Sequence, residues 1–205
     1  SPRRGNDLTA ILDDHPEALL VLDDHWGALA EGRLTLLPNG RTRWLYIRSM
    51  SKALGPDLRI AVVLGDEMTI DRMRRQFSLG PRWVSGLLQS LAHQLWRDPQ
   101  THMLHDTARR AYRSRRDALL AAFAGHGIRA HGLSGIHVWL PVKDEAAVAQ
   151  MLMGAGWAVQ PGGPFRLSSS PAIRLSIGNL AVDQVQDLAK DVARALAEGQ
   201  GAVPT

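Results

Sequence analysis

Short apolar runs separated by turn residues dominate the first third of the chain and predict an α/β arrangement. Residues 18–22 are continuously apolar, which is typical of a strand buried on both faces in a parallel sheet. Residues 43–48 and 60–64 are also short and apolar, and we expect a strand at each. The opening SPRRGND carries breaker residues and predicts a turn, followed by a short helix over residues 8–12.

The pattern becomes helical after Pro81 and then alternates again. Leucines recur at helical spacing over residues 83–96, an Asp-Pro pair interrupts them, and a second long helix is expected over residues 101–124. We expect the boundary between two structural regions near residues 98–116. The remainder predicts a small α+β layer with strands at 136–140, 157–159 and 173–177 and helices at 145–153 and 182–196.

The composition excludes several classes of protein. The 205 residues are 45% hydrophobic and 21% charged, which is typical of a folded chain, and without cysteine there is no disulfide or thiolate metal site. The net charge of +4 is a mild excess that does not by itself indicate nucleic acid binding. No apolar run reaches the ~18 residues of a membrane helix and no signal peptide opens the chain, so we expect a cytoplasmic protein.

The strongest chemical signal is SMSKALGPDLR at residues 49–59. Lys52 follows a predicted strand, and a nucleophilic lysine needs such a partly desolvated position. Ser49, Ser51 and Arg59 offer hydroxyl and guanidinium groups that suit a phosphate. The alternative is a solvated loop with incidental charges, and both interpretations stay open at this point.

Two further positions carry candidate binding groups. The sequence DDH at residues 23–25 ends the first predicted strand, and one carboxylate there suits a positively charged ring nitrogen; a solvated strand edge or a helix cap is the alternative. Arg174 lies in a strand of alternating pattern. There it either faces water or binds a substrate carboxylate through two parallel hydrogen bonds.

Other groups give weaker signals. His102 and His105 have a spacing compatible with a metal ion, but no third ligand is suggested nearby, so we expect exposed helix residues and no metal. The arginines of residues 109–116 predict a solvated or interdomain face, or alternatively a partner or phosphate surface. The leucines of residues 87–95 form a strip that suits core packing or a dimer contact.

The aspartate, the lysine segment and the late arginine, in this order and spacing, resemble the fold type I pyridoxal phosphate (PLP) enzymes of the aspartate aminotransferase superfamily. The chain looks still more similar to the aminotransferase-like domain of the MocR subgroup of GntR-type transcription regulators. The segments that carry this resemblance run from residue 1 to about residue 196: SPRRGN, LLVLDDH, LYIRSMSKALGPDLRIAVVLG, FSLGPRWVSGLLQSLAHQL and IRLSIGNL.

The resemblance implies a role for each candidate residue. Lys52 is expected to form the internal Schiff base with PLP, and Asp23 to pair with the pyridine nitrogen. Asn6 and His25 are expected near the phenolic oxygen of the ring. Arg174 is expected to receive the carboxylate of an amino-acid-like ligand. The phosphate is expected to be held by Ser49, Ser51 and Arg59.

The resemblance also implies an incomplete domain. Asn6 is not followed by the family's P-T-G, and the chain opens without methionine. The 205 residues lack the first half of the large domain, with its Gly-rich phosphate loop, and the winged-helix DNA-binding domain. We therefore expect a C-terminal fragment. It would comprise part of the PLP-binding large domain (1–97), a linking helix (98–116) and a small α+β domain (117–205).

Three functions follow from these expectations. The favoured one is a PLP-binding effector and oligomerisation domain of a GntR/MocR-type regulator. It would be a homodimer that binds an amino-acid-like effector and contacts DNA only through a winged-helix domain. The alternative is a PLP-dependent aminotransferase acting on an amino acid, because the sequence does not separate regulator from enzyme. The third is a cofactor-free interaction module.

Overall fold

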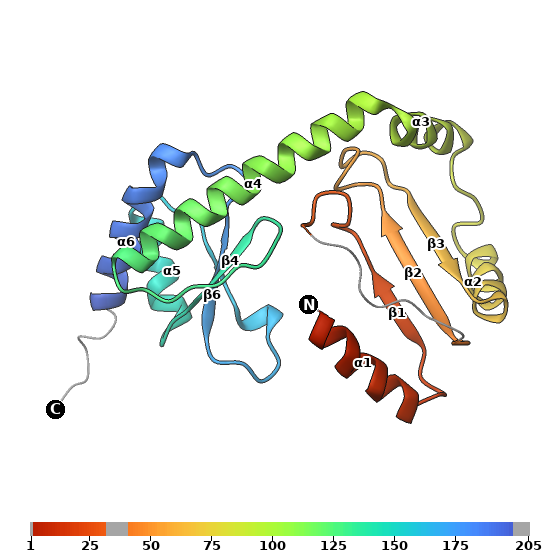
Figure 1. Ribbon diagram of the computed structural model, residues 1–205, viewed down its shortest axis with the longest axis horizontal. Helices are drawn as coiled ribbons and strands as arrows, with labels where there is room; N and C mark the ends of the chain where they lie inside the picture. The colour runs from red at the N-terminus through yellow and green to blue at the C-terminus, as the bar shows by residue number, and fades with distance from the viewer. Residues whose placement is uncertain (1, 32–40, 199–205) are drawn as a thin grey trace. The chain divides into compact units, whose positions relative to one another are not determined.

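The computed structural model describes the backbone of residues 2–31 and 41–198, and the side chains from residue 7 onward. It divides into two compact units, Ser1–Thr107 (unit 1) and Ala108–Thr205 (unit 2). The division falls inside the segment 98–116, and the long helix α4 (Pro99–Gly125) continues through it (Figure 1).

Unit 1 is built on a three-stranded sheet of order β1-β2-β3 (Figure 1). Its strands are β1 (Leu20–Asp23), β2 (Trp44–Ser49) and β3 (Ala61–Gly65). β1 and β2 are parallel, with Asp23 opposite Ile47, whereas β2 and β3 are antiparallel. The three predicted strands are therefore present, each displaced by one or two residues from the expected range.

The first helix, α1 (Pro2–Asp14), includes the segment for which a turn was predicted, so that prediction was wrong. Proline is tolerated at the first position of a helix, where its missing N–H has no intrahelical partner to lose. The end of α1 is held by Arg41, whose guanidinium donates to the carbonyl of Leu12 at 2.7 Å. It also donates to the carbonyls of His15 at 2.9 Å and Ala18 at 2.7 Å.

Helix α2 (Glu67–Leu79) was not predicted from the sequence. Asp66 caps its start: the carboxylate accepts from the backbone N–H of Thr69 at 3.0 Å and from that of Trp44 at 2.8 Å. The cap thus ties the start of α2 to the first residue of β2.

Helix α3 (Gly86–Arg97) begins three residues later than the predicted start at 83. Arg82 adopts a positive φ of 66°, which is incompatible with a continuous α-helix. The hydroxyl of Ser85 then accepts from the backbone N–H of Leu88 and caps the helix at 3.4 Å.

Unit 1 has a small core and a largely uncovered sheet. Met50, Ile60 and Ala92 form its buried cluster. Along β1, half-buried and exposed residues alternate, and Val21 is 48% exposed. The expectation that residues 18–22 are buried on both faces was therefore wrong for the described part of the chain, where β1 is an edge strand.

Unit 2 contains the second sheet and the larger core. Its strands are β4 (His137–Pro141), β5 (Gln160–Pro161) and β6 (Ala172–Ser176), all antiparallel in the order β4-β6-β5. Figure 1 labels the paired strands β4 and β6. The strand predicted at 157–159 thus begins at residue 160. The helices of the unit are the remainder of α4, α5 (Glu145–Gly154), α6 (Val185–Glu198) and two short 3₁₀ turns, Gly163–Phe165 and Val182–Gln184.

The core of unit 2 forms where α4, α5 and α6 contribute side chains to one cluster with the sheet. Phe123 from α4, Leu140 from β4 and Ile173 from β6 are each fully buried. Burying a side chain of this size stabilises a fold by about 1.5–3 kcal/mol, so this cluster dominates the packing of unit 2.

Two expectations for α4 are corrected by the structure. His102 is exposed as expected, but His105 is buried, with 8% of its surface accessible. Arg116 is 4% exposed and Arg115 donates to the carbonyl of Gly178, so neither arginine lies on a solvated face. Polar side chains on this helix therefore make specific contacts within their own units.

The leucine strip of α3 is only partly core: Leu88 packs against the buried cluster of unit 1 and Leu95 is half-buried, whereas two leucines are exposed. Leu87 is 85% exposed and Leu91 is 44% exposed.

No helix in the described residues is both long and apolar enough to span a bilayer.

Candidate functional site

Lys52 lies in a tight turn that follows β2. The backbone N–H of Met50 donates to Ile60 at 2.9 Å, and those of Ala53 and Leu54 donate back to the carbonyl of Met50 at 3.2 and 2.8 Å. The side chain of Lys52 is exposed. Lys52 has no hydrogen-bond or ion-pair partner among the described residues, and its exposed amine does not have the partial desolvation that was expected from the sequence.

The end of β1 brings acidic and aromatic groups to the same edge of the sheet. Because β1 and β2 are parallel, their carboxyl ends meet there, and the N–H of Asp24 donates to the carbonyl of Ile47 at 2.8 Å. Asp23 Oδ1 lies 3.3 Å from His25 Nδ1. The Nζ atom of Lys52 lies 5.7 Å from the ring centroid of Trp26, the residue after His25. The structure therefore gathers the aspartate, the histidine and the lysine at one sheet edge.

The three groups expected to hold a phosphate are also adjacent. The N–H of Ser51 donates to Ser49 Oγ at 3.4 Å, and Arg59 Nη1 donates to Ser51 Oγ at 3.3 Å. Gly55, with φ of 122°, allows the turn that returns Arg59 toward the strand end. The hydroxyl of Ser51 itself donates to the carbonyl of Leu58 at 2.6 Å. Ser51 thus orients the loop and Arg59, while the remaining N–H groups of Arg59 and the hydroxyl of Ser49 can donate to an anion.

A polar network that the sequence analysis missed lies beside this edge. Tyr46 donates its hydroxyl to Asp24 Oδ2 at 2.5 Å, and Arg48 Nη1 lies 3.2 Å from the same oxygen. Arg48 also donates to the hydroxyl of Tyr46 at 3.0 Å and stacks on the ring of Trp96, 4.9 Å from its centroid. Burial, and then the hydrogen bond to Asp24, raise the pKa of Tyr46 above its ordinary value. The available signal was the period of two along β2, which places Tyr46 and Arg48 on the same face of the strand.

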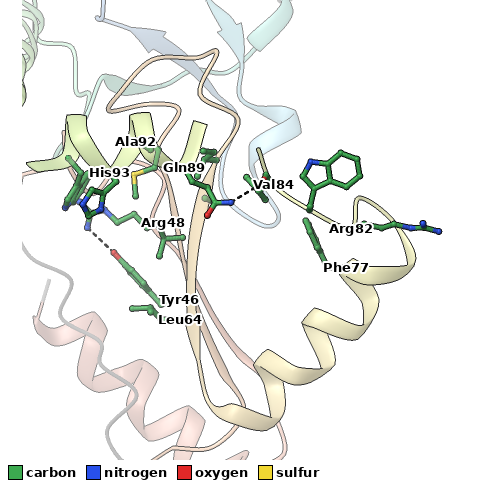
Figure 2. A pocket seen from close by; sticks show the side chains of 15 residues that line it. Tyr46, Arg48, Leu64, Phe77, Arg82, Val84, Gln89, Ala92 and His93 are labelled. Atoms are coloured by element: carbon green, nitrogen blue, oxygen red, sulfur yellow. Dashed lines mark hydrogen bonds between the residues drawn. The ribbon is translucent and has the colours of Figure 1, made fainter. Parts of the chain in front are cut away.

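A cavity of unit 1 adjoins this network and not the lysine. It measures about 700 Å³ and is lined by Tyr46 and Arg48 from β2 and by residues from β3, α2 and α3 (Figure 2). Figure 2 also shows the hydrogen bond from Arg48 to Tyr46 and that from Gln89 to the carbonyl of Val84. Lys52 is not among the residues that line the cavity.

Arg174 belongs to unit 2, whereas the lysine edge belongs to unit 1. Its guanidinium lies 4.0 Å from the ring centroid of Phe165, and it donates to the side-chain oxygen of Gln160 on β5. The Nε atom of Arg174 is buried without a hydrogen-bond partner in the described structure. The aromatic ring and the glutamine hold the guanidinium in place, and its role toward a ligand stays a prediction.

Asn6 is the remaining candidate, and its side chain lies outside the described residues.

The structure also bears on whether the chain could bind a metal ion. The described residues contain no group of three or more His, Cys, Asp or Glu side chains that could hold a metal ion.

Comparison with known proteins gives the family of this chain. Residues 4–192 match the model of the family described as aminotransferase class I and II. The chain is 34% identical over 200 residues to the vitamin B6 salvage pathway transcriptional repressor PtsJ of Salmonella typhimurium. The match covers 96% of this chain and 46% of that repressor, so the chain spans about half the length of its relative.

Solved structures give the same fold. The alpha-aminoadipate aminotransferase LysN of Thermus thermophilus, solved with N-(5'-phosphopyridoxyl)-L-leucine, matches with a TM-score of 0.80 and 23% identity, over 97% of this chain and 55% of that one. The multiple substrate aminotransferase of Thermococcus profundus matches with a TM-score of 0.85 and 19% identity, over 99% and 53%. The α/β fold is therefore that of fold type I aminotransferases, covering about half of their chains. The chain belongs to the aminotransferase class I and II family.

Proposed function

We propose that this chain is the PLP-binding effector and oligomerisation domain of a transcription regulator of the GntR/MocR type. The observation that carries the proposal is the 34% identity to a vitamin B6 salvage repressor over 96% of the chain. In this proposal, DNA is contacted by a winged-helix domain outside these 205 residues, and the protein works in the cytoplasm.

The donor set at the lysine edge fits pyridoxal phosphate. Lys52 presents an exposed amine that contacts an indole ring and has no hydrogen-bond or ion-pair partner in the described structure. The carboxylate of Asp23 is 63% exposed and lies beside the imidazole of His25. Both side chains are therefore accessible to a ring nitrogen and its neighbouring hydroxyl. Ser49 and Arg59 provide hydrogen-bond donors that complement a phosphate.

In this proposal, each residue at the lysine edge contacts a different part of pyridoxal phosphate. When bound, pyridoxal phosphate supplies an aldehyde that condenses with a primary amine and a ring that withdraws electrons once its nitrogen is protonated. Lys52 provides that amine, and Asp23 keeps the proton on the ring nitrogen through its negative charge. Arg59 balances the phosphate charge, while Ser51 keeps Arg59 oriented toward the strand end.

We propose that Arg174 binds the carboxylate of an amino-acid-like effector and that the regulator is a homodimer. Carboxylate binding is supported by the guanidinium of Arg174, which contacts Phe165 and Gln160 and has one buried N–H without a hydrogen-bond partner in the described structure. The homodimer is supported by the exposed leucines of α3, which include Leu87 at 85% exposure. Effector binding would then change the preference of the dimer for its operator.

A PLP-dependent aminotransferase is the second candidate, favoured by the family match and by solved aminotransferases with the same fold. The two differ in turnover. A regulator would exchange at most one amino group per bound PLP, whereas an enzyme would convert an amino acid and a keto acid through many cycles. Steady-state product formation with a panel of amino acids measures this difference.

The test of cofactor binding itself is chemical. The full-length protein is incubated with pyridoxal phosphate, reduced with borohydride and digested, and the modified peptide is identified by mass. We expect the label on Lys52 and its loss in Lys52→Ala. Label that persists on Lys143 or Lys190 would refute the assignment, and the absence of any label would favour a cofactor-free interaction module.

A further inference from the structure

The turn that carries Lys52 is held from several sides. The N–H of Met50 donates to Ile60, and the hydroxyl of Ser51 donates to Leu58. Met50 is itself part of the small core of unit 1. These contacts fix the two arms of the loop to each other, and the N–H groups of Ala53 and Leu54 donate to the carbonyl of Met50. The carbonyl of Ala53, just after the lysine, is bound by a residue from outside the loop.

That residue is His105 of α4. Its Nε2 atom lies 2.9 Å from the carbonyl oxygen of Ala53, which follows Lys52 directly, across 52 positions of sequence. Because a carbonyl only accepts, Nε2 must carry the proton in this contact. His105 is 8% exposed, so the hydrogen bond is shielded from competing water.

The geometry restricts the backbone at the reactive residue. The N–H of Ala53 is bound to Met50 and its carbonyl to His105, so both polar groups of the residue after the lysine are engaged. Apart from its contact with the ring of Trp26, the Lys52 side chain has no hydrogen-bond or ion-pair partner in the described structure, so the direction in which it leaves the turn depends mainly on this backbone. Losing the imidazole would leave the Ala53 carbonyl without a described partner and loosen the turn.

We propose that His105 is a positioning residue for Lys52: it holds the peptide after the lysine and so orients the amine toward the edge formed by Asp23 and His25. This inference rests on the proposed function for its consequence in PLP binding. The placement of the loop does not depend on the cofactor.

The test compares three substitutions in the full-length protein. His105→Gln keeps an N–H close to the place of Nε2, His105→Asn offers one that falls short of it, and His105→Leu removes the donor. His102→Leu is the matched control, because His102 is exposed on the same helix and its ring neighbours that of His105 at 6.4 Å without contacting the turn by a hydrogen bond.

The first readout is amide hydrogen exchange of residues 50–58 without pyridoxal phosphate, together with the thermal midpoint. We expect exchange there to be roughly fivefold to tenfold faster in His105→Leu and His105→Asn, near wild type in His105→Gln and unchanged in His102→Leu. Unchanged exchange in a folded His105→Leu protein would overturn the proposal. So would a loss of stability across the whole chain that His105→Gln does not rescue.

The second readout is the affinity for pyridoxal phosphate, measured from the absorbance of the covalent adduct. We expect it to fall by a similar factor in His105→Leu and to recover in His105→Gln. An unchanged affinity in His105→Leu would overturn the link to Lys52. If the wild-type protein takes up no pyridoxal phosphate, the proposed function fails, and the exchange measurement still decides whether His105 holds the turn.

Discussion

The amine of Lys52 lies 5.7 Å from the centre of the Trp26 indole ring. Trp26 follows β1 and Lys52 follows β2, so this contact links the segments after two parallel strands at one edge of the unit 1 sheet. A pyridoxyl group attached to this lysine would absorb the light that a nearby indole emits. We therefore expect tryptophan fluorescence to fall when the adduct forms, and to fall less in Trp26→Phe. The emission spectrum before and after borohydride reduction measures this; equal quenching in both proteins would place the reacting lysine elsewhere.

The network of Tyr46, Asp24 and Arg48 should contribute to stability. Removing the hydroxyl in Tyr46→Phe takes one hydrogen bond from a partly buried carboxylate, at a cost of about 1–2 kcal/mol. Urea unfolding followed by circular dichroism measures the loss. A variant as stable as wild type would show that the contact with Arg48 alone is enough to compensate the charge and the hydrogen-bonding needs of the Asp24 carboxylate.

The same tyrosine predicts a response to alkali. Burial raises the pKa of Tyr46 above 10, so the folded state holds the phenolic proton more tightly than the unfolded chain. The contribution of this tyrosine to stability is then complete below pH 10 and is lost as the pH rises through the folded pKa. Absorbance titration of the phenolate should show a late component that disappears in Tyr46→Phe.

Asp66 predicts a response to acid. The hydrogen bond from Thr69 lowers the pKa of Asp66 from 3.8 to about 2, with a further contribution from the N–H of Trp44. A carboxylate with a depressed pKa stabilises the fold fully above the unfolded value of 3.8, and this contribution is lost as the pH falls toward 2.

The matching variant is Asp66→Asn, which keeps a cap acceptor but removes the charge. We expect it to unfold at lower denaturant concentration than wild type at pH 6, and the difference to shrink between pH 4 and pH 2. A difference that stays constant over this range would mean that charge at position 66 contributes nothing.

Arg41 predicts a local effect at the N-terminal helix. Its guanidinium binds three carbonyls at the end of α1, and hydrogen bonds to a charged group contribute about 1.5–3 kcal/mol each. Arg41→Met should therefore raise amide exchange in residues 8–14 by at least roughly tenfold. Residues 119–123 of unit 2 serve as the internal control, because they belong to the other unit.

Much of this architecture could be predicted from local pattern. The apolar runs gave the three strands of unit 1 within two residues, and helical spacing gave α4, α5 and α6. The edge that carries Lys52 was predictable because polar residues directly follow two parallel strands. Ser51 and Arg59 also met as expected, since a short turn with Gly55 leaves them little choice.

The remaining features depend on contacts between distant residues, and no local signal encodes them. His105 looks like an exposed helix histidine until α4 meets the loop of Ala53. Pro2 reads as a breaker, yet the helix that it opens is held at its far end by Arg41. Val21 reads as buried, but the described sheet ends at β1 and leaves it half exposed.

The most direct test of the central claim is the visible absorbance of the purified full-length protein after addition of pyridoxal phosphate and removal of the excess. The account predicts a yellow protein with one cofactor per chain, whose band is absent in Lys52→Ala and retained in Lys190→Ala. A protein that stays colourless, or a band that survives Lys52→Ala, would contradict it.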